Sequence, residues 1–470
     1  MNAAPGAAPR HRRGRLAGLA CLGVLAVSGP AAGAPQPGIN AEPVRLVRPV
    51  ARPLSEMARI GRDLFFDTRL SASGGLSCAG CHDPARAYGP PDDRSAPLGG
   101  VGGRDEGRRA VPSLRYVDRV PAFGIGPDEV VEGAASPVSL ARPGAPPRKV
   151  AGAAAAAAMV PAGGLFWDGR AGSLQLQAMG PLFNPEEMAN RDTAALARRL
   201  RAAYGSRLAA LIGAPAVEDL RRLVFEAAYA VVRFELEDPS FHPYSSKYDA
   251  YLEGRARLTP EEARGLAAFD DPARGNCAAC HLDRPDAAGR PPVFTDFQYE
   301  ALGVPRNGAL PANRDTGSYD LGLCGPGQTD LARERQYCGM FRTPTLRNVA
   351  TRGVFFHNGR YHRLEDVLAF YALRDAKPDS IYPRGPDGRL RRFDDLPAAD
   401  TANADRTDRP FGAPTGAGSP LSAQDRRDII AFLRTLSDGY GAAAPASGHE
   451  DDLAPRARLH HAAVRLRRGG

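Results

Sequence analysis

The sequence predicts a mainly α-helical protein made of two related halves, with long loops and inserts. Two copies of a Cys-x-x-Cys-His motif lie about 199 residues apart in the 470-residue chain, and a segment with apolar residues at helical spacing precedes each copy. Glycine (52 residues) and proline (43 residues) together form about a fifth of the chain, which indicates long connections around the helical cores. The net charge is +8, but residues 1–34 carry four arginines and no acidic residue, so the remainder gives no reason to expect nucleic-acid binding.

The first residues have the order of a secretory signal peptide, which we place at residues 1–34. A basic stretch, Arg10–Arg15, runs into an apolar stretch, Leu16–Val27, and small residues follow. The apolar stretch is shorter than the ~20 residues that span a bilayer, although a retained anchor is the alternative. Cleavage after Ala34 satisfies the small-residue rule, but Pro35 follows it and leaves the site open. We therefore expect a periplasmic protein without a membrane span after signal removal.

The two Cys-x-x-Cys-His motifs indicate two covalently bound c-type haems. In this signature two thiols attach to the haem vinyl groups and the following histidine binds the iron. The residues concerned are Cys78, Cys81 and His82 in the first motif and Cys277, Cys280 and His281 in the second. A zinc site, one alternative, would require further cysteine or histidine ligands nearby, and a thioredoxin-like redox pair, the other, requires no following histidine. The two halves are therefore predicted to be cytochrome c-like haem domains.

Helices are expected before and after each motif. In the first half the apolar residues of 54–65 have helical spacing, and a long amphipathic helix over 220–234 closes this half. In the second half Thr259–Glu262 is a capping box with proline at the first helical position. A terminal amphipathic helix over 421–436 is expected to pack beside the helix that this capping box starts.

These features define the expected domain boundaries. The N-terminal domain is assigned to residues 45–236 and the C-terminal domain to residues 258–440, with a linker at 237–257. Residues 119–161, which include six consecutive alanines among proline and glycine, are interpreted as an insert in the N-terminal domain. The tail, residues 441–470, is expected to be disordered.

Two further cysteines, Cys324 and Cys338, flank a loop rich in glycine and proline. Because the haem motifs use four thiols and export places the chain in an oxidising compartment, a disulfide between the two is the simplest outcome. Closing a loop of roughly 15 residues would contribute about 3 kcal/mol on the chain-entropy estimate. Two free buried thiols are the alternative.

Motifs beyond the haem signatures give a resemblance to a known family. They are Leu64–Asp67, His82–Pro84, Phe166–Arg170, Met340–Val349 and Phe355–Gly359. Through them, residues 50–440 resemble the bacterial dihaem cytochrome c peroxidase family and its MauG-like branch. Members of that family cleave hydrogen peroxide at one haem and handle electrons at the other. The resemblance therefore implies a peroxide-dependent oxidoreductase.

The resemblance assigns the peroxide site to the haem of His82. Many classical members carry a histidine between the first haem motif and the tryptophan motif, which blocks the iron. Here no histidine occurs between His82 and His242, so we expect an open iron. The family spacing implies that Glu187 is the acid/base group of the distal pocket, with Gln177 as a polar partner and Pro181 as a shaping residue.

Two of these assignments have plain structural alternatives. Glu187 follows Glu186 directly, so it could be a solvated loop carboxylate. Trp167 is the only tryptophan, and the resemblance places it between the haems, where a transiently oxidised indole would shorten an electron hop. The alternative for Trp167 is a buried core aromatic.

The second haem is expected to have His281 and Tyr371 as its ligands. The family's axial position lies fourteen residues after the histidine of the Phe-Phe-His motif, here His357. Classical peroxidases carry methionine at that position, and MauG-like enzymes carry tyrosine, whose phenolate favours the higher oxidation states of iron. The alternatives are Tyr371 as a core aromatic, or ligation by His357, His362 or Met340.

Calcium binding between the domains is doubtful in this chain. Classical members bind the ion through an asparagine side chain and two backbone carbonyls. The asparagine position is Ala110 here, and the carbonyls would belong to Arg352 and Val354. The lost oxygen and the nearby cation both weaken a site for a hard cation.

Three functions are consistent with these residues. The favoured one is MauG-like: reduction of hydrogen peroxide at the N-terminal haem, sharing of oxidising equivalents with the second haem, and oxidation of a partner protein. The alternative is a periplasmic peroxidase that detoxifies peroxide with electrons from a small cytochrome c or a cupredoxin. A non-catalytic dihaem electron carrier is the third, and the missing distal histidine argues against it.

Overall fold

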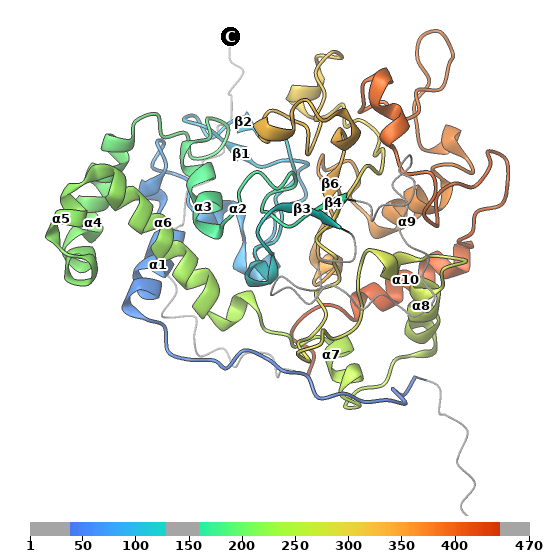
Figure 1. Cartoon of the computed structure of the whole chain (residues 1–470), viewed down its shortest axis with the longest axis horizontal. Coiled ribbons are helices and arrows are strands. Elements are labelled where there is room, and N and C mark those ends of the chain that lie inside the picture. The colour runs from blue at the N-terminus through green and yellow to red at the C-terminus, as the bar shows by residue number, and fades with distance from the viewer. Residues whose placement is uncertain (1–37, 128–158, 442–470) are drawn as a thin grey trace, which may run out of the picture. The chain divides into compact units, whose positions relative to one another are not determined.

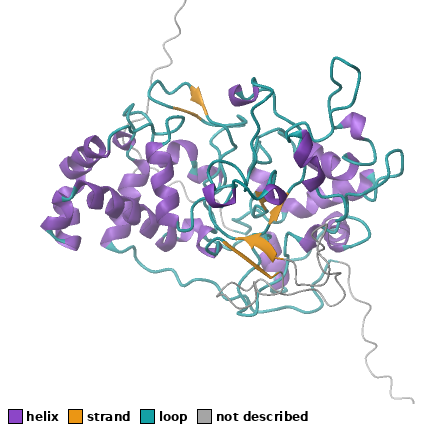
Figure 2. Cartoon of the chain, turned by 45° about the horizontal axis from the view of Figure 1, so that its top comes forward, coloured by secondary structure: helices purple, strands orange, loops and turns teal. Residues whose placement is uncertain are grey.

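In the computed structural model, residues 38–127 and 159–441 are described. The predicted signal peptide (1–34), most of the predicted insert and nearly all of the predicted tail lie outside these ranges. The described residues are mostly helical with little sheet, as the sequence predicted (Figure 2). The helices are α1 (Glu56–Phe66), α2 (Cys78–Cys81), α3 (Leu174–Phe183), α4 (Thr193–Ile212), α5 (Ala214–Glu218), α6 (Leu220–Glu237), α7 (Lys247–Leu252), α8 (Pro260–Asp270), α9 (Leu364–Leu373) and α10 (Ala423–Arg434).

In the described part of the chain, three small antiparallel sheets of two strands each accompany the helices. They pair β1 (Leu98–Gly99) with β2 (Asp105–Glu106), β3 (Gly124–Pro127) with β4 (Met159–Ala162), and β5 (Tyr299–Glu300) with β6 (Phe341–Arg342). No helix among residues 38–127 and 159–441 is both long and apolar enough to cross a bilayer.

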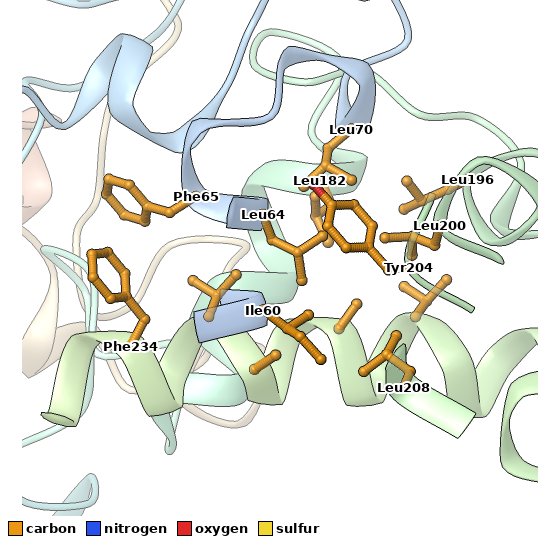
Figure 3. Close-up of a cluster of buried hydrophobic side chains, with 14 of the residues drawn as sticks. Ile60, Leu64, Phe65, Leu70, Leu182, Leu196, Leu200, Tyr204, Leu208 and Phe234 are labelled. Carbon is orange, nitrogen blue, oxygen red and sulfur yellow. The ribbon is translucent and has the colours of Figure 1, made fainter. Parts of the chain in front are cut away.

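The described helices gather mainly around two hydrophobic cores, one in each half. In the first half α1 packs against α6, with α3 and α4 beside α6. The buried side chains of this core include Ile60, Leu64, Phe65, Leu196, Leu200, Leu208 and Phe234 (Figure 3). In the second half α8 packs against α10, as the sequence predicted, and the core includes Phe269, Phe294, Leu368, Ile429 and Phe432. Figure 1 shows α1 beside α6 and α8 beside α10.

A glycine permits the close helix crossing in each half. A Cβ atom on Gly61 of α1 would lie 1.8 Å from the carbonyl oxygen of Ala230 in α6. A Cβ atom on Gly265 of α8 would lie 1.9 Å from the carbonyl oxygen of Asp428 in α10. Each half therefore requires a glycine where the helix before its Cys-x-x-Cys-His motif crosses its last helix, which indicates that the two halves are copies of one structural unit.

Local capping starts these helices where the sequence places them. The Thr259 hydroxyl accepts a hydrogen bond from the Glu262 amide, and the Glu262 carboxylate accepts one from the Thr259 amide, which confirms the predicted capping box. Ser422 starts α10 in the same way. The segment 237–257, predicted as a linker, contains α7, and its Tyr248 and Leu252 belong to the core of the second half.

The two halves meet through a reciprocal pair of backbone hydrogen bonds. The Ala110 amide donates to the His357 carbonyl at 2.8 Å, and the Arg342 amide donates to the Trp167 carbonyl at 2.8 Å. Ala110 and Arg342 each lie two residues before a Pro-Ser or Pro-Thr pair, while Trp167 and His357 each lie in a Phe-x-x-Gly-Arg segment. The contact is therefore repeated across the junction, as in a symmetric dimer.

Candidate active site

A cavity in the N-terminal half, the N-terminal cavity, brings together the residues predicted for the peroxide site. Its lining includes Cys78, Cys81, His82, Gln177, Pro181 and Glu187. The cysteines and the histidine come from α2 and the residue after it, while Gln177 and Pro181 come from α3. Apolar side chains of α1, α4 and α6 complete the wall. This set fits a haem attached through the two thiols.

His82 is held in the form that an iron ligand requires. Its Nδ1 atom donates to the Tyr88 carbonyl at 3.1 Å, which leaves the lone pair of Nε2 for a metal. Burial lowers the pKa of His82 to about 4, so the imidazole is neutral at pH 7. In the second half His281 Nδ1 donates to the Phe294 carbonyl at 2.9 Å.

A hydroxyl group supports each of these histidines in the same way. Ser113 Oγ donates to the Ala87 carbonyl and Thr345 Oγ1 donates to the Val293 carbonyl, both at 2.6 Å. Ala87 directly precedes Tyr88, and Val293 directly precedes Phe294. Tyr88 and Phe294 are the residues whose carbonyls accept the histidine hydrogen bonds. The proximal side of the predicted haem is thus built twice from equivalent residues.

Glu187, and not the neighbouring Glu186, lines the N-terminal cavity. Asn184 Nδ2 donates to Glu187 Oε1 at 2.6 Å, and the Gly100 amide after β1 donates to the Glu187 carbonyl at 2.7 Å. Burial raises the pKa of the Glu187 carboxyl, and the hydrogen bond from Asn184 compensates in part. Glu186 instead pairs with Arg108 at 3.1 Å near the surface. The cavity position supports an acid/base role over that of a solvated loop carboxylate.

Glu235 of α6 is a second carboxyl in this cavity, which the sequence analysis did not identify. Its side chain is buried, and its Oε2 atom has no hydrogen-bond partner in the described structure. Burial raises the pKa of Glu235 to about 8. The sequence feature that could have identified Glu235 is its position on the apolar face of the predicted helix, four residues after Val231.

A larger cavity in the C-terminal half, the C-terminal cavity, contains the residues predicted for the second haem. Its lining includes Cys277, Cys280, His281, Tyr371, Trp167, His357, Arg342 and Arg352. Burial raises the pKa of the Tyr371 phenol. Of the three alternative ligands, only His357 lines this cavity. Its ring stacks on Phe341 with 3.5 Å between centroids, and its Nε2 lies 3.7 Å from Asp395.

Pro181 and Tyr371 occupy equivalent positions in the two halves. Helix α3 starts seven residues after Trp167 and α9 starts seven residues after His357. Phe166 and Phe356, the residues before Trp167 and His357, have positive φ angles of 65° and 63°, so the two turns have the same backbone conformation. Pro181 lies fourteen residues after Trp167, as Tyr371 does after His357. The position that carries a potential oxygen ligand in one half therefore carries a residue without a ligand atom in the other.

Trp167 lies at the junction of the two halves. Its indole Nε1 donates to the Ala110 carbonyl at 2.8 Å, and its own carbonyl accepts from Arg342. The next residue, Asp168, is buried and pairs with Arg109 at 2.8 Å, whose guanidinium also binds Asp320 at 2.7 Å. These contacts fix the tryptophan in the wall of the C-terminal cavity.

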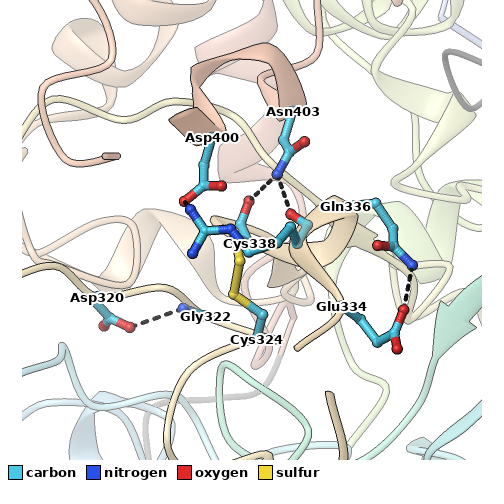
Figure 4. The surroundings of a disulfide bond; sticks show 9 residues. Asp320, Gly322, Cys324, Glu334, Gln336, Cys338, Asp400 and Asn403 are labelled. Carbon is cyan, nitrogen blue, oxygen red and sulfur yellow. Dashed lines mark hydrogen bonds and ion pairs between the residues drawn. A yellow bond between two sulfur atoms is a disulfide. The ribbon is translucent and has the colours of Figure 1, made fainter. Parts of the chain in front are cut away.

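The disulfide Cys324–Cys338 closes a loop beside this junction (Figure 4). Asn403 Nδ2 donates to the Cys338 carbonyl at 3.1 Å and holds one end of the loop. Within the loop, Gln328 Nε2 donates to the Asp168 carbonyl at 3.1 Å. The cross-link therefore restrains the segment that covers the tryptophan motif.

Comparisons with known proteins agree with this architecture. Residues 55–257 match the family of di-haem cytochrome c peroxidases. The methylamine utilization protein MauG of Paracoccus denitrificans is 33% identical over 439 residues, which cover 89% of this chain and 95% of that protein. The cytochrome c551 peroxidase of Nitrosomonas europaea is 26% identical over 333 residues, which cover 70% of this chain and 76% of that protein.

Solved structures give the same result. The diheme peroxidase BthA from Burkholderia thailandensis has a TM-score of 0.71 and 38% identity, and the match covers 86% of this chain and 94% of that one. A MauG-like protein associated with microbial copper homeostasis has a TM-score of 0.55 and 25% identity, over 86% and 97% of the two chains. The chain therefore belongs to the di-haem cytochrome c peroxidase family, and it is an oxidoreductase that acts with peroxide and uses two c-type haems.

Proposed function

We propose that the protein reduces hydrogen peroxide in the N-terminal cavity and uses the oxidising equivalents, shared with the C-terminal site, to oxidise a partner protein. Each cavity would hold one haem, through Cys78, Cys81 and His82 in the first and through the second motif and Tyr371 in the other. Haem iron, when bound, accepts peroxide and supplies the redox chemistry that breaks its O–O bond. The chain's own residues supply the proton transfer and determine which of the two cavities admits peroxide.

The observation that carries the proposal is the contrast between Pro181 and Tyr371. A proline offers no atom to an iron, so the distal side of the N-terminal cavity stays available to peroxide. In the second half a phenol lies at the equivalent position, in the cavity lined by His281. An anionic phenolate favours higher oxidation states, so the C-terminal site suits the storage of an oxidising equivalent. It is less suited to delivering electrons from a high-potential donor.

Glu187 is the group that would move the proton. A peroxide bound in this cavity must lose a proton from its inner oxygen and gain one at its outer oxygen before the O–O bond breaks. Burial raises the pKa of the Glu187 carboxyl above its ordinary value, which makes the carboxylate a better proton acceptor. Gln177, which is buried and lines the same cavity, can orient the outer oxygen through its amide.

We further propose that the partner meets the enzyme outside the cytosol. Residues 1–34 have the order of an export signal, and c-type haem motifs agree with an oxidising compartment. The partner would be the protein substrate whose residue loses electrons. In the peroxidase alternative it would be a small cytochrome c or a cupredoxin that supplies them.

A single mixing experiment separates these two functions. Hydrogen peroxide is added to the oxidised holoenzyme with and without a reduced small cytochrome c, and the absorption spectrum is followed by stopped flow. A doubly oxidised enzyme that persists and reacts slowly with the cytochrome supports the proposal. Rapid catalytic oxidation of the cytochrome would instead favour the detoxifying peroxidase.

The role of Glu187 has a matched control in its neighbour. Glu187→Gln keeps the shape of the side chain and removes its acid/base function, so the reaction with peroxide should slow by about 100-fold or more. Glu186→Gln changes a carboxylate outside the cavity, and the reaction rate should stay near that of the wild type. Equal rates for the two variants would remove Glu187 from the mechanism, and the haem spectrum checks that both retain the cofactor.

A further inference from the structure

Arg352 places a half-buried positive charge at the junction of the two halves. It lines the C-terminal cavity, and within the described residues no carboxylate lies within 4.0 Å of its guanidinium. The guanidinium of an arginine is a cation at neutral pH. Partial removal of a cation from water without a carboxylate beside it has a desolvation cost, so other polar groups must compensate it.

Two backbone carbonyls, one from each half, accept hydrogen bonds from this cation. Arg352 Nε donates to the Val354 carbonyl at 3.2 Å, and Nη2 donates to the Val111 carbonyl at 2.8 Å. Val111 follows Ala110, whose amide already binds the second half. The guanidinium therefore joins the segment 110–111 to the segment 352–354.

The resemblance to classical family members implies a calcium ion at this same place, and the residues do not fit it. Ala110 has no side-chain oxygen, and the Val354 carbonyl, one of the expected calcium ligands, already accepts from Arg352. A guanidinium beside the remaining carbonyl oxygen would repel a divalent cation. Within residues 38–127 and 159–441, no group of three or more His, Cys, Asp or Glu side chains could hold a metal ion.

We propose that the Arg352 guanidinium is the structural cation of this junction and that the enzyme therefore needs no divalent cation there. This positive charge is part of the protein, so the junction does not depend on the supply of calcium. Its planar set of N–H donors can bind several carbonyl oxygens at once, which is the task that a coordinated ion would otherwise perform.

The first test uses the purified wild-type holoenzyme. After dialysis against EGTA, elemental analysis should find well under one calcium per chain. The thermal midpoint, measured by circular dichroism, should be the same with EGTA and with added calcium chloride. One tightly held calcium per chain, or a midpoint that falls on chelation, would overturn the proposal.

The second test changes the cation itself. Arg352→Met keeps much of the side-chain volume but leaves both carbonyls without their donor, so the midpoint should fall by about 4 °C. Arg352→Lys retains a charge and should recover part of that loss. Equal midpoints for Arg352→Met and the wild type would contradict a structural role.

A gain of calcium dependence would support the assignment directly. The double variant Arg352→Ala/Ala110→Asn frees the Val354 carbonyl and adds a side-chain oxygen. Its midpoint should rise on addition of calcium, whereas the single variant Arg352→Ala, which lacks that oxygen, should respond less. If neither variant yields folded protein, the calcium content of the wild type still decides the proposal.

Discussion

Glu235→Gln replaces the buried carboxyl of the N-terminal cavity by a neutral group of the same shape. Glu235 is 2% exposed, and its Oε2 atom has no hydrogen-bond partner in the described structure. Burial raises its pKa from the ordinary 4.5 to about 8, because the interior disfavours the ionised form. The folded protein therefore keeps this proton at neutral pH, while the unfolded chain releases it above about pH 4.5.

The sign and size of the effect follow from this difference in bound protons. Where the folded state binds one proton more than the unfolded state, the free energy of unfolding falls as the pH rises, by about 1.4 kcal/mol per pH unit. The contribution of Glu235 to the stability of the wild type should therefore fall by about 4 kcal/mol between pH 5 and pH 9, with most of the fall below the folded pKa of about 8. Glutamine does not titrate, so Glu235→Gln should gain about 4 kcal/mol relative to the wild type over the same interval.

Urea unfolding of the holoenzymes, followed by far-ultraviolet circular dichroism at pH 5 and pH 9, measures this difference. Glu226→Gln is the control on the same helix, because the Glu226 carboxylate pairs with Arg222 near the surface, 3.5 Å away. That variant should differ from the wild type by about the same amount at both pH values. A difference between Glu235→Gln and the wild type that stays constant from pH 5 to pH 9 would refute the reasoning.

Three further predictions concern the framework and the second haem. Gly61→Ala should cost about 3 kcal/mol, because its Cβ would lie 1.8 Å from a carbonyl oxygen of α6, whereas Gly172→Ala, with nothing within 4 Å of the new Cβ, should cost far less in the same urea titration. Asp249→Asn should cost about 3–5 kcal/mol, since Arg347, with 1% of its side chain exposed, loses its charge partner. Tyr371→Met should raise the reduction potential of the second haem in a spectroelectrochemical titration. An unchanged potential would show that Tyr371 is not a ligand.

Much of the helical framework could be predicted because its signals are local. The capping residues and apolar spacing of 54–65, 220–234 and 421–436 mark α1, α6 and α10 without reference to the rest of the chain. Helix α4 was not predicted, although its buried residues recur every four positions from Leu196 to Leu208. Its arginines and many alanines give it little contrast between its two faces, so only packing against α6 shows which side is buried.

The site was predictable where a spacing fixes the chemistry and was missed where burial decides it. Gln177, Pro181 and Glu187 gather in one cavity with His82, as the family spacing implied. Without the family spacing, the sequence does not distinguish Glu187 from Glu186, because the loop after α3 decides which carboxylate turns inward. Glu235 was missed for a related reason: a glutamate near the end of a helix is usually solvated, and the unpartnered carboxyl is visible only once the helices are packed.

The duplicated framework suggests how two equivalent sites would acquire the unequal chemistry that we propose. The proximal side is the same in both halves, from the histidine Nδ1 bond to the supporting hydroxyl, so it cannot set the difference. The distal helices differ at equivalent positions: Gln177 corresponds to the buried Val367, Pro181 to Tyr371 and Glu187 to the exposed Lys377. At the first and third of these positions, the amide and the carboxyl that line a cavity thus occur only in the half without a potential distal ligand. Because these changes lie on one helix and the loop after it, the proposed division of labour between the halves can arise while α1 still packs on α6 and α8 on α10.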